Sequence, residues 1–137
     1  MSDYVLDACA LIAYLNGEPG QEKVLAVLEA AEQGTATVRM HRLNFYEVYY
    51  DAYRSGGPAV AEQFWVDVSQ LPIDFVDILS ETLLKEAAYF KVNYKISLAD
   101  SIALGLTILH QAEVVTSDHH EFDRIEQNEP LRFLWIR

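Results

Sequence analysis

Short apolar runs alternate with longer segments of helical periodicity along the whole chain of 137 residues. In such a chain each apolar run is expected to form a buried strand, and each helical segment to lead back to the same sheet. The runs lie at residues 3–7, 36–40, 72–76, 114–117 and 132–136. This pattern predicts an α/β fold, with a central, mostly parallel, five-stranded sheet flanked by helices in an α/β/α arrangement.

Helical segments fill the intervals between the expected strands. Apolar residues spaced three and four apart predict helices at about 10–15, 21–33, 44–54, 59–70, 80–93 and 97–111. Gly34 and the Gly-Gly-Pro segment 56–58 are typical stop signals. Because no repeat, low-complexity tract or long linker divides the chain, we expect one domain that extends over residues 1–137.

Composition excludes several classes of protein. Apolar residues make up 51% of the chain, which is too many for a disordered protein, and the single Cys9 rules out a disulfide framework or a Cys-rich zinc site. The most apolar segment, 98–115, contains Asp100, His110 and Glu113, so it is expected to be a buried helix and strand rather than a membrane span. Without an apparent export signal, the protein is expected to be soluble and cytoplasmic.

Four acidic residues stand where a strand is expected to end or a helix to begin. Asp7 closes the first apolar run and Asp118 follows the fourth, so both are expected at the carboxyl ends of parallel strands, where α/β proteins bind ligands. Glu47 and Asp100 lie near the amino ends of apolar helices and can face the same edge. Because hard cations such as Mg²⁺ prefer oxygen ligands, these four carboxylates are predicted to form a metal site.

Each of the four also has a purely structural interpretation. Asp7 and Asp118 suit the N-cap position of a helix, and the segments 44–47 and 97–100 resemble capping boxes. For any one carboxylate the two interpretations are about equally good. Four carboxylates gathered together repel one another at low dielectric constant, however, so their convergence favours a bound cation.

The formal net charge of −11 argues against a protein that coats nucleic acid nonspecifically, because such binding depends on basic side chains that displace counterions. The charge is compatible with a nuclease whose metal ions supply the local positive charge. Six basic residues near the carboxylates are candidate phosphate contacts, although a solvated helix charge is the simpler interpretation of each one singly. They are Arg39, Arg42, Arg54, Lys85, Lys91 and Lys95.

The segments that carry the carboxylates resemble the motifs of the PIN-domain family. Residues 4–15 are similar to the opening motif of that family, in which a strand delivers the first acidic residue. The segments 44–50, 97–104 and 114–118 are similar to the motifs with the second, third and fourth acidic residues. The resemblance covers the whole chain, and a stand-alone domain of this length looks most like a VapC-type toxin of a type II toxin–antitoxin pair.

The resemblance implies a divalent-metal-dependent endoribonuclease that hydrolyses RNA phosphodiester bonds by a metal-activated water. A cognate antitoxin protein would hold it inactive. The implied catalytic residues, which are also the implied ligands of Mg²⁺ or Mn²⁺, are Asp7, Glu47, Asp100 and Asp118.

Residues beside these carboxylates are assigned supporting roles or none. Thr116 and Ser117 are candidates for orienting Asp118 or a water. Asp123 matches a further acidic position of some relatives, but a solvated first-turn position is the favoured explanation. Cys9 stands where many relatives have a small hydroxyl or amide residue. We expect this difference to affect the rate of the reaction rather than its class.

His119 and His120 follow Asp118 directly, yet adjacent side chains diverge on a helix, so joint ligation of a metal is not expected. The favoured interpretation is that both are exposed residues at the start of a helix. No Ser-His-Asp or Cys-His arrangement is evident, in keeping with a reaction in which water is the nucleophile.

Aromatic residues predict partner surfaces. Tyr46, Tyr49, Tyr50 and Tyr53 recur at helical spacing, so most are expected in the core and the rest in a groove for an antitoxin or a second copy of the chain. We expect a homodimer, and an antitoxin segment that inserts near the carboxylates.

Two alternatives within the same fold remain: a non-toxin PIN ribonuclease of RNA processing, and a catalytically silent PIN-like binding module. A phosphatase of the haloacid dehalogenase type is disfavoured because Cys9 occupies the place of its second Asp. A response-regulator receiver is disfavoured because the paired acidic residue and late Lys that it needs are not visible.

Overall fold

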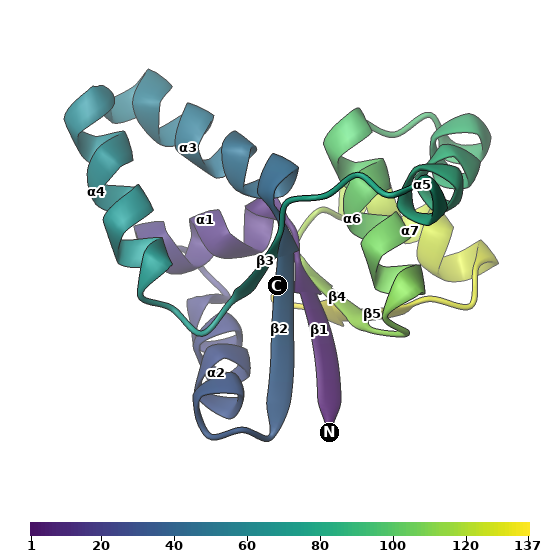
Figure 1. Ribbon diagram of the computed structural model, residues 1–137, viewed down its shortest axis with the longest axis horizontal. Helices are drawn as coiled ribbons and strands as arrows, with labels where there is room; N and C mark the ends of the chain where they lie inside the picture. The colour runs from purple at the N-terminus through teal and green to yellow at the C-terminus, as the bar shows by residue number, and fades with distance from the viewer.

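The computed structural model describes residues 1–137 and contains a single five-stranded sheet (Figure 1). The strands are β1 (Ser2–Leu6), β2 (Ala36–His41), β3 (Asp74–Val76), β4 (Glu113–Thr116) and β5 (Arg132–Trp135). They lie in the order β3-β2-β1-β4-β5, and every neighbouring pair is parallel. The predicted α/β fold with five strands is confirmed, and the sheet is entirely rather than mostly parallel.

Seven helices connect the strands: α1 (Ala8–Asn16), α2 (Gln21–Glu32), α3 (Arg42–Gly56), α4 (Pro58–Ser69), α5 (Glu81–Tyr94), α6 (Leu98–Leu109) and α7 (His119–Asn128). In Figure 1, α1 to α4 gather on one side of the sheet and α5 to α7 on the other. None of the seven is both long enough and apolar enough to cross a membrane.

The two faces of the sheet are buried separately because successive strand residues point to opposite sides. Leu6 and Val115 belong to the apolar core under α1 to α4. Val5 and Val114, their neighbours in sequence, pack into the clusters under α5, α6 and α7. The expected three-layer α/β/α arrangement is therefore present.

The start of α3 differs from the sequence prediction. The helix begins at Arg42 rather than 44, because His41 acts as its N-cap: the ring Nδ1 accepts a hydrogen bond from the backbone N of Leu43 at 3.0 Å. The interpretation of 44–47 as a capping box is therefore wrong. Of the two hydrogen bonds of a capping box at 97–100, one is present: the Ser97 hydroxyl caps α6 by accepting from the backbone N of Asp100 at 3.1 Å.

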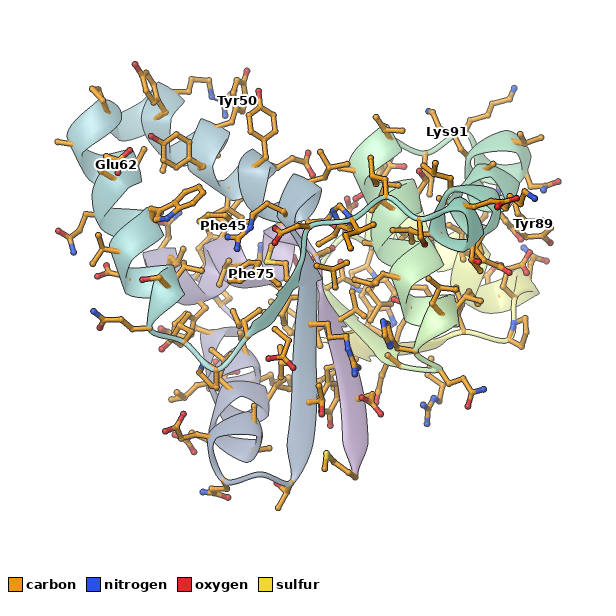
Figure 2. All side chains as sticks on the ribbon, in the orientation of Figure 1. Phe45, Tyr50, Glu62, Phe75, Tyr89 and Lys91 are labelled. Atoms are coloured by element: carbon orange, nitrogen blue, oxygen red, sulfur yellow. The ribbon has the colours of Figure 1, made fainter.

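The prediction that most tyrosines of α3 lie in the core is also wrong. The buried face of α3 is formed by Asn44, Phe45, Val48 and Ala52. The tyrosines follow the same periodicity on the opposite side of the helix, so Tyr46, Tyr50 and Tyr53 are 61%, 54% and 51% exposed. In Figure 2, Phe45 lies inward near Phe75, whereas Tyr50 stands on the outer side of α3.

Candidate active site

Asp7 lies at the carboxyl end of β1, and its side chain is buried at 1% exposure. It caps α1: its Oδ1 accepts a hydrogen bond from the backbone N of Ala10 at 2.9 Å, and its Oδ2 accepts one from the Thr116 hydroxyl. Burial raises the pKa of Asp7 to about 7 in spite of these bonds, with a further contribution from the charges of Asp100 and Asp118. The carboxylate is therefore fixed by the protein but poorly solvated.

Thr116 connects Asp7 to Asp118 across two adjacent strands. β1 and β4 pair with Leu6 opposite Val115, so the residues that follow them emerge side by side. The Thr116 hydroxyl, which donates to Asp7, also accepts from the backbone N of Asp118 at 3.0 Å. Asp118 in turn caps α7, since its Oδ1 accepts from the backbone N of Glu121 at 3.1 Å.

Glu47 approaches the same edge of the sheet from the second turn of α3, and Asp100 from the first turn of α6. Burial is the main cause that raises the pKa of Asp100 to about 7, followed by the charges of Asp118 and Glu47. Burial, and then the charge of Asp118, raise the pKa of Glu47. Because the charge of Asp118 helps to raise the pKa of Asp7, Glu47 and Asp100, the four carboxylates share one electrostatic environment.

An open pocket of about 270 Å³ lies at this edge of the sheet. It is lined by Ala8, Cys9, Ile12, Glu47, Tyr50, Asp51, Arg54, Asp100 and Asp118. Three of the four carboxylates thus face a single space. Asp7 does not line it, since its buried side chain is turned toward Ala10 and Thr116.

The four carboxylates fit a hard divalent cation by their chemistry. None of them takes part in any of the salt bridges of the protein, so their negative charge is not neutralised by a Lys, Arg or His. No three Asp, Glu, His or Cys side chains are arranged as a ready set of metal ligands.

Asn44 is a buried polar residue that the sequence analysis did not single out as part of the site. Its Nδ2 donates to the backbone oxygen of Ala99 at 3.0 Å, which ties the first turn of α3 to the first turn of α6. Its Oδ1 is buried without a hydrogen-bond partner. Asn44 thus sets the relative position of the two helices that carry Glu47 and Asp100. The sequence did carry a signal for this role, because Asn44 is a polar residue on the helix face that is otherwise apolar, with Phe45 and Val48.

The other residues considered beside the carboxylates lie in different surroundings. Burial first, and then the surrounding carboxylates, raise the pKa of Cys9 to about 12, so its thiol stays protonated. Ser117 is half-buried. Asp123 is exposed and pairs with the Nδ1 of His119 at 2.8 Å, while that imidazole stacks on Trp135. His120 is exposed, and neither histidine lines the acidic pocket.

Of the six basic residues proposed as phosphate contacts, only Arg54 lines the acidic pocket. Arg54 pairs there with Asp51, which lines the same pocket, at 2.8 Å. The others engage acidic side chains or backbone elsewhere, or lie exposed. Three of them form salt bridges: Arg39 with Asp3, Arg42 with Asp77, and Lys85 with Glu81. Lys91 donates to the backbone oxygen of Ile96. Lys95 is exposed at the end of α5. A single basic side chain therefore borders the carboxylates.

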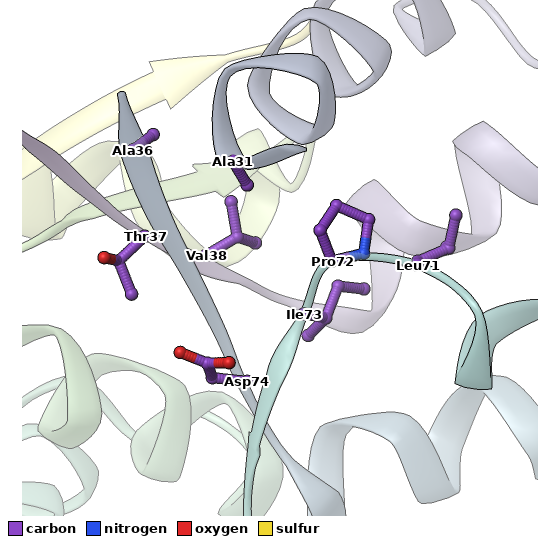
Figure 3. Close-up of a pocket in the computed structure, with 8 residues that line it drawn as sticks. All are labelled: Ala31, Ala36, Thr37, Val38, Leu71, Pro72, Ile73 and Asp74. Carbon is purple, nitrogen blue, oxygen red and sulfur yellow. The ribbon is translucent and has the colours of Figure 1, made fainter. Parts of the chain in front are cut away.

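A different pocket, of about 300 Å³, lies near the amino end of β2 and the loop before β3 (Figure 3). Its lining is mainly apolar and contributes one carboxylate, that of Asp74. Because it gathers neither a cluster of titratable groups nor a nucleophile, it does not compete with the acidic pocket as the site of chemistry.

The family model described as the PIN domain matches residues 4–128. Among solved structures, the fold is similar to a toxin–antitoxin complex from Klebsiella pneumoniae (TM-score 0.71, 18% identity, 98% of each chain covered). It is also similar to DNA-bound VapBC from Salmonella typhimurium (TM-score 0.71, 16% identity, 100% of each chain). A third similar structure is VapC20 of Mycobacterium tuberculosis, described as a sarcin-ricin loop cleaving toxin (TM-score 0.62, 11% identity, 81% of this chain and 86% of that one). No curated protein sequence matches the chain.

Proposed function

Because the chain belongs to the PIN-domain family, we propose that it is a divalent-metal-dependent endoribonuclease and the toxin of a type II, VapBC-like toxin–antitoxin pair. The observation that carries the proposal is the convergence of four carboxylates, without a neutralising side chain, at the carboxyl edge of the sheet. The similarity to VapBC complexes and to a toxin that cleaves the sarcin-ricin loop supports both the RNA substrate and the antitoxin partner.

The proposed ligands of Mg²⁺ or Mn²⁺ are Asp7, Glu47, Asp100 and Asp118. When bound there, the ion would supply a positive charge for the scissile phosphate and lower the pKa of a water. Thr116 fixes the position of the Asp7 carboxylate relative to the backbone of Asp118, because its hydroxyl bonds to both. Asp100 would hold the ion from the first turn of α6, where Ser97 caps the helix.

The test of this function is cleavage of a mixed cellular RNA pool by the purified protein in the cytoplasmic pH range. Reactions contain Mn²⁺, Mg²⁺ or EDTA, and Asp100→Asn is prepared in parallel. We expect cuts at few sites with either metal, none in EDTA and none with the variant. Folded wild-type protein that neither cuts RNA nor binds Mn²⁺ would instead identify a non-catalytic binding module.

Thr116→Val is expected to slow RNA cleavage by about 10- to 100-fold, the range for residues that orient metal ligands. Valine has a similar shape but cannot bond to Asp7 and Asp118 as the Thr116 hydroxyl does. Thr116→Ser keeps the hydroxyl and should retain most activity. Initial cleavage rates at saturating Mn²⁺ measure both effects, and a larger loss in Thr116→Ser than in Thr116→Val would mean that packing of the methyl group matters instead of the hydroxyl.

His119→Ala and His120→Ala are expected to retain most of the cleavage rate. Both imidazoles are exposed outside the acidic pocket, and His119 is occupied by Asp123 and by the backbone oxygen of Arg137. Initial rates of RNA cleavage for the two variants and the wild type provide the measurement. A loss in either variant that matches the loss in Asp100→Asn would overturn the assignment of the reaction to the carboxylates.

We also propose that the chain forms a homodimer and that an antitoxin segment reaches the acidic pocket. Sedimentation of the protein at micromolar concentration, alone and with the candidate antitoxin, tests both parts. A monomer that is unaffected by the antitoxin would contradict them.

A further inference from the structure

Four tyrosines on the outer side of α3 form a small apolar pocket next to the acidic one. The pocket holds about 220 Å³ and is lined by Tyr46, Tyr49, Tyr50, Tyr53 and Arg54. The rings form two pairs, Tyr46 with Tyr50 (centroids 6.4 Å apart) and Tyr49 with Tyr53 (6.3 Å), and no ring contact joins one pair to the other. We call this space the tyrosine slot.

One wall of the slot is held firmly by the neighbouring helix. The hydroxyl of Tyr49 donates to the Glu62 carboxylate of α4 at 2.7 Å, and its ring packs edge-on against Trp65 with centroids 5.7 Å apart. The rings of Tyr46, Tyr50 and Tyr53 are at least half exposed, and their hydroxyls take part in no hydrogen bond within the protein. The slot therefore presents aromatic surface to solvent on a rigid support.

The tyrosine slot and the acidic pocket adjoin each other. Tyr50 and Arg54 line both, and the guanidinium of Arg54 lies 5.6 Å from the centre of the Tyr50 ring. Arg54 is the sole Lys or Arg in the lining of either pocket. A ligand that spans the two spaces thus meets carboxylates, then the guanidinium of Arg54, which pairs with Asp51 at 2.8 Å, and then flat aromatic surface.

We propose that the tyrosine slot binds a nucleobase of single-stranded RNA next to the phosphate held at the acidic pocket, with Tyr50 as the stacking residue. The inference rests on the proposed function, because it takes a phosphate to lie at the carboxylates. RNA carries a flat base and a phosphate in every repeat, so a phosphate at the carboxylates brings an adjoining base within reach of the slot. Aromatic side chains bind such bases by stacking.

The slot would act as a specificity subsite that selects unpaired RNA. A base within a duplex is stacked on its neighbours and cannot enter the slot, whereas a loop or single strand presents its bases freely. Stacking accepts every base, so the slot would discriminate single-stranded from paired RNA more strongly than one sequence from another.

The experiment measures binding of two short labelled strands of equal charge: oligoadenylate, and a chain of abasic ribose phosphates of the same length. Fluorescence anisotropy is recorded in Ca²⁺, a hard cation with oxygen ligands, and a gel confirms that the RNA stays intact. The wild type, Tyr50→Phe, Tyr50→Ala and Tyr89→Ala are compared. Tyr89 is the matched control, since it is 48% exposed on α5, away from α3 (Figure 2).

We expect the wild type, Tyr50→Phe and Tyr89→Ala to bind oligoadenylate roughly 5- to 150-fold more tightly than the abasic chain, the range for stacking one base. In Tyr50→Ala this preference should largely disappear, with affinity for the abasic chain unchanged. Equal binding of the two strands by the wild type overturns the proposal. So does a Tyr50→Ala variant with normal RNA binding that has lost a dimer in sedimentation, because the slot is then a protein interface.

Cleavage of oligoadenylate and of the RNA pool in Mn²⁺, measured on the same preparations, separates this inference from the proposed function. Base-dependent binding without cleavage would overturn the nuclease and leave the slot as an RNA-binding surface. Cleavage by the wild type and by Tyr50→Ala at equal rates, with equal affinity for oligoadenylate, would overturn the slot and leave the nuclease intact.

Discussion

We expect Asp7→Asn to remove metal-dependent RNA cleavage while the protein stays folded. The asparagine side chain has nearly the same shape, and its oxygen can still accept from the backbone N of Ala10, because Asn and Asp are equally good N-caps. It cannot supply a negative charge to a cation. We expect the rate to fall by about 10²- to 10³-fold or more, the range for removing one electrostatic stabiliser of a transition state.

Single-turnover cleavage at saturating Mn²⁺, together with the melting temperature, provides the measurement. Asp67→Asn is the matched control: it makes the same chemical change at an exposed position of α4, where the Asp67 carboxylate accepts from Gln63. The control should keep the full cleavage rate. If Asp7→Asn cuts RNA as fast as the control, Asp7 is a helix cap only and the proposed site is wrong.

The metal-free protein is expected to lose stability as the pH rises from about 4 to about 7. The folded protein has Asp7 and Asp100 with pKa values raised to about 7 by burial, against the ordinary value of 3.8. Over this window the folded state holds protons that the unfolded chain has released, so the free energy of unfolding falls with rising pH. For the buried Asp7, the free energy of unfolding should fall by a total on the order of 4 kcal/mol over this pH window.

This pH dependence is measured by thermal melting in EDTA between pH 5 and pH 8. Asp7→Asn should show a flatter profile than the wild type and should melt higher at pH 8, because it has no charge to desolvate at that position. Asp67→Asn should follow the wild type. Parallel profiles for the wild type and Asp7→Asn would show that the charged Asp7 carboxylate does not oppose folding.

Mn²⁺ is expected to offset the loss of folding stability at pH 8, because the carboxylates are ionised there and can bind a cation. A ligand at 100 times its dissociation constant stabilises the folded state by about 2.7 kcal/mol. The increase in melting temperature should be large in the wild type, small in Asp7→Asn, and smaller at pH 5 because protons then compete with the ion. An equal increase in all variants would place Mn²⁺ elsewhere on the protein.

Much of the architecture could be predicted because local sequence carries it. A strand buried on both faces contains adjacent apolar residues, as Val114 and Val115 do in β4, and helices such as α6 repeat apolar residues at helical spacing. The positions of Asp7 and Asp118 follow from the same logic, since parallel neighbours deliver their last residues to one edge. Their roles as metal ligands remain predictions.

Other features could not be predicted because they depend on which elements become neighbours in space. The bond from Asn44 to Ala99 joins residues 55 positions apart, and the bond from Thr116 to Asp7 spans 109. The tyrosines of α3 show a different limit. The helix carries two stripes with the same periodicity, and the sequence alone does not say which of them faces the sheet.

The sequence by itself determined the alternation of strands and helices and the placing of an acidic residue at or near four of their ends, because burial and capping act over a few residues. Tertiary structure decided the rest: it set β1 beside β4, tied α3 to α6 through Asn44, and turned the tyrosines outward. Those choices depend on packing between distant segments, and they gather four separate carboxylates at one edge of the sheet, where the charge of Asp118 acts on the other three and the pocket borders an aromatic slot.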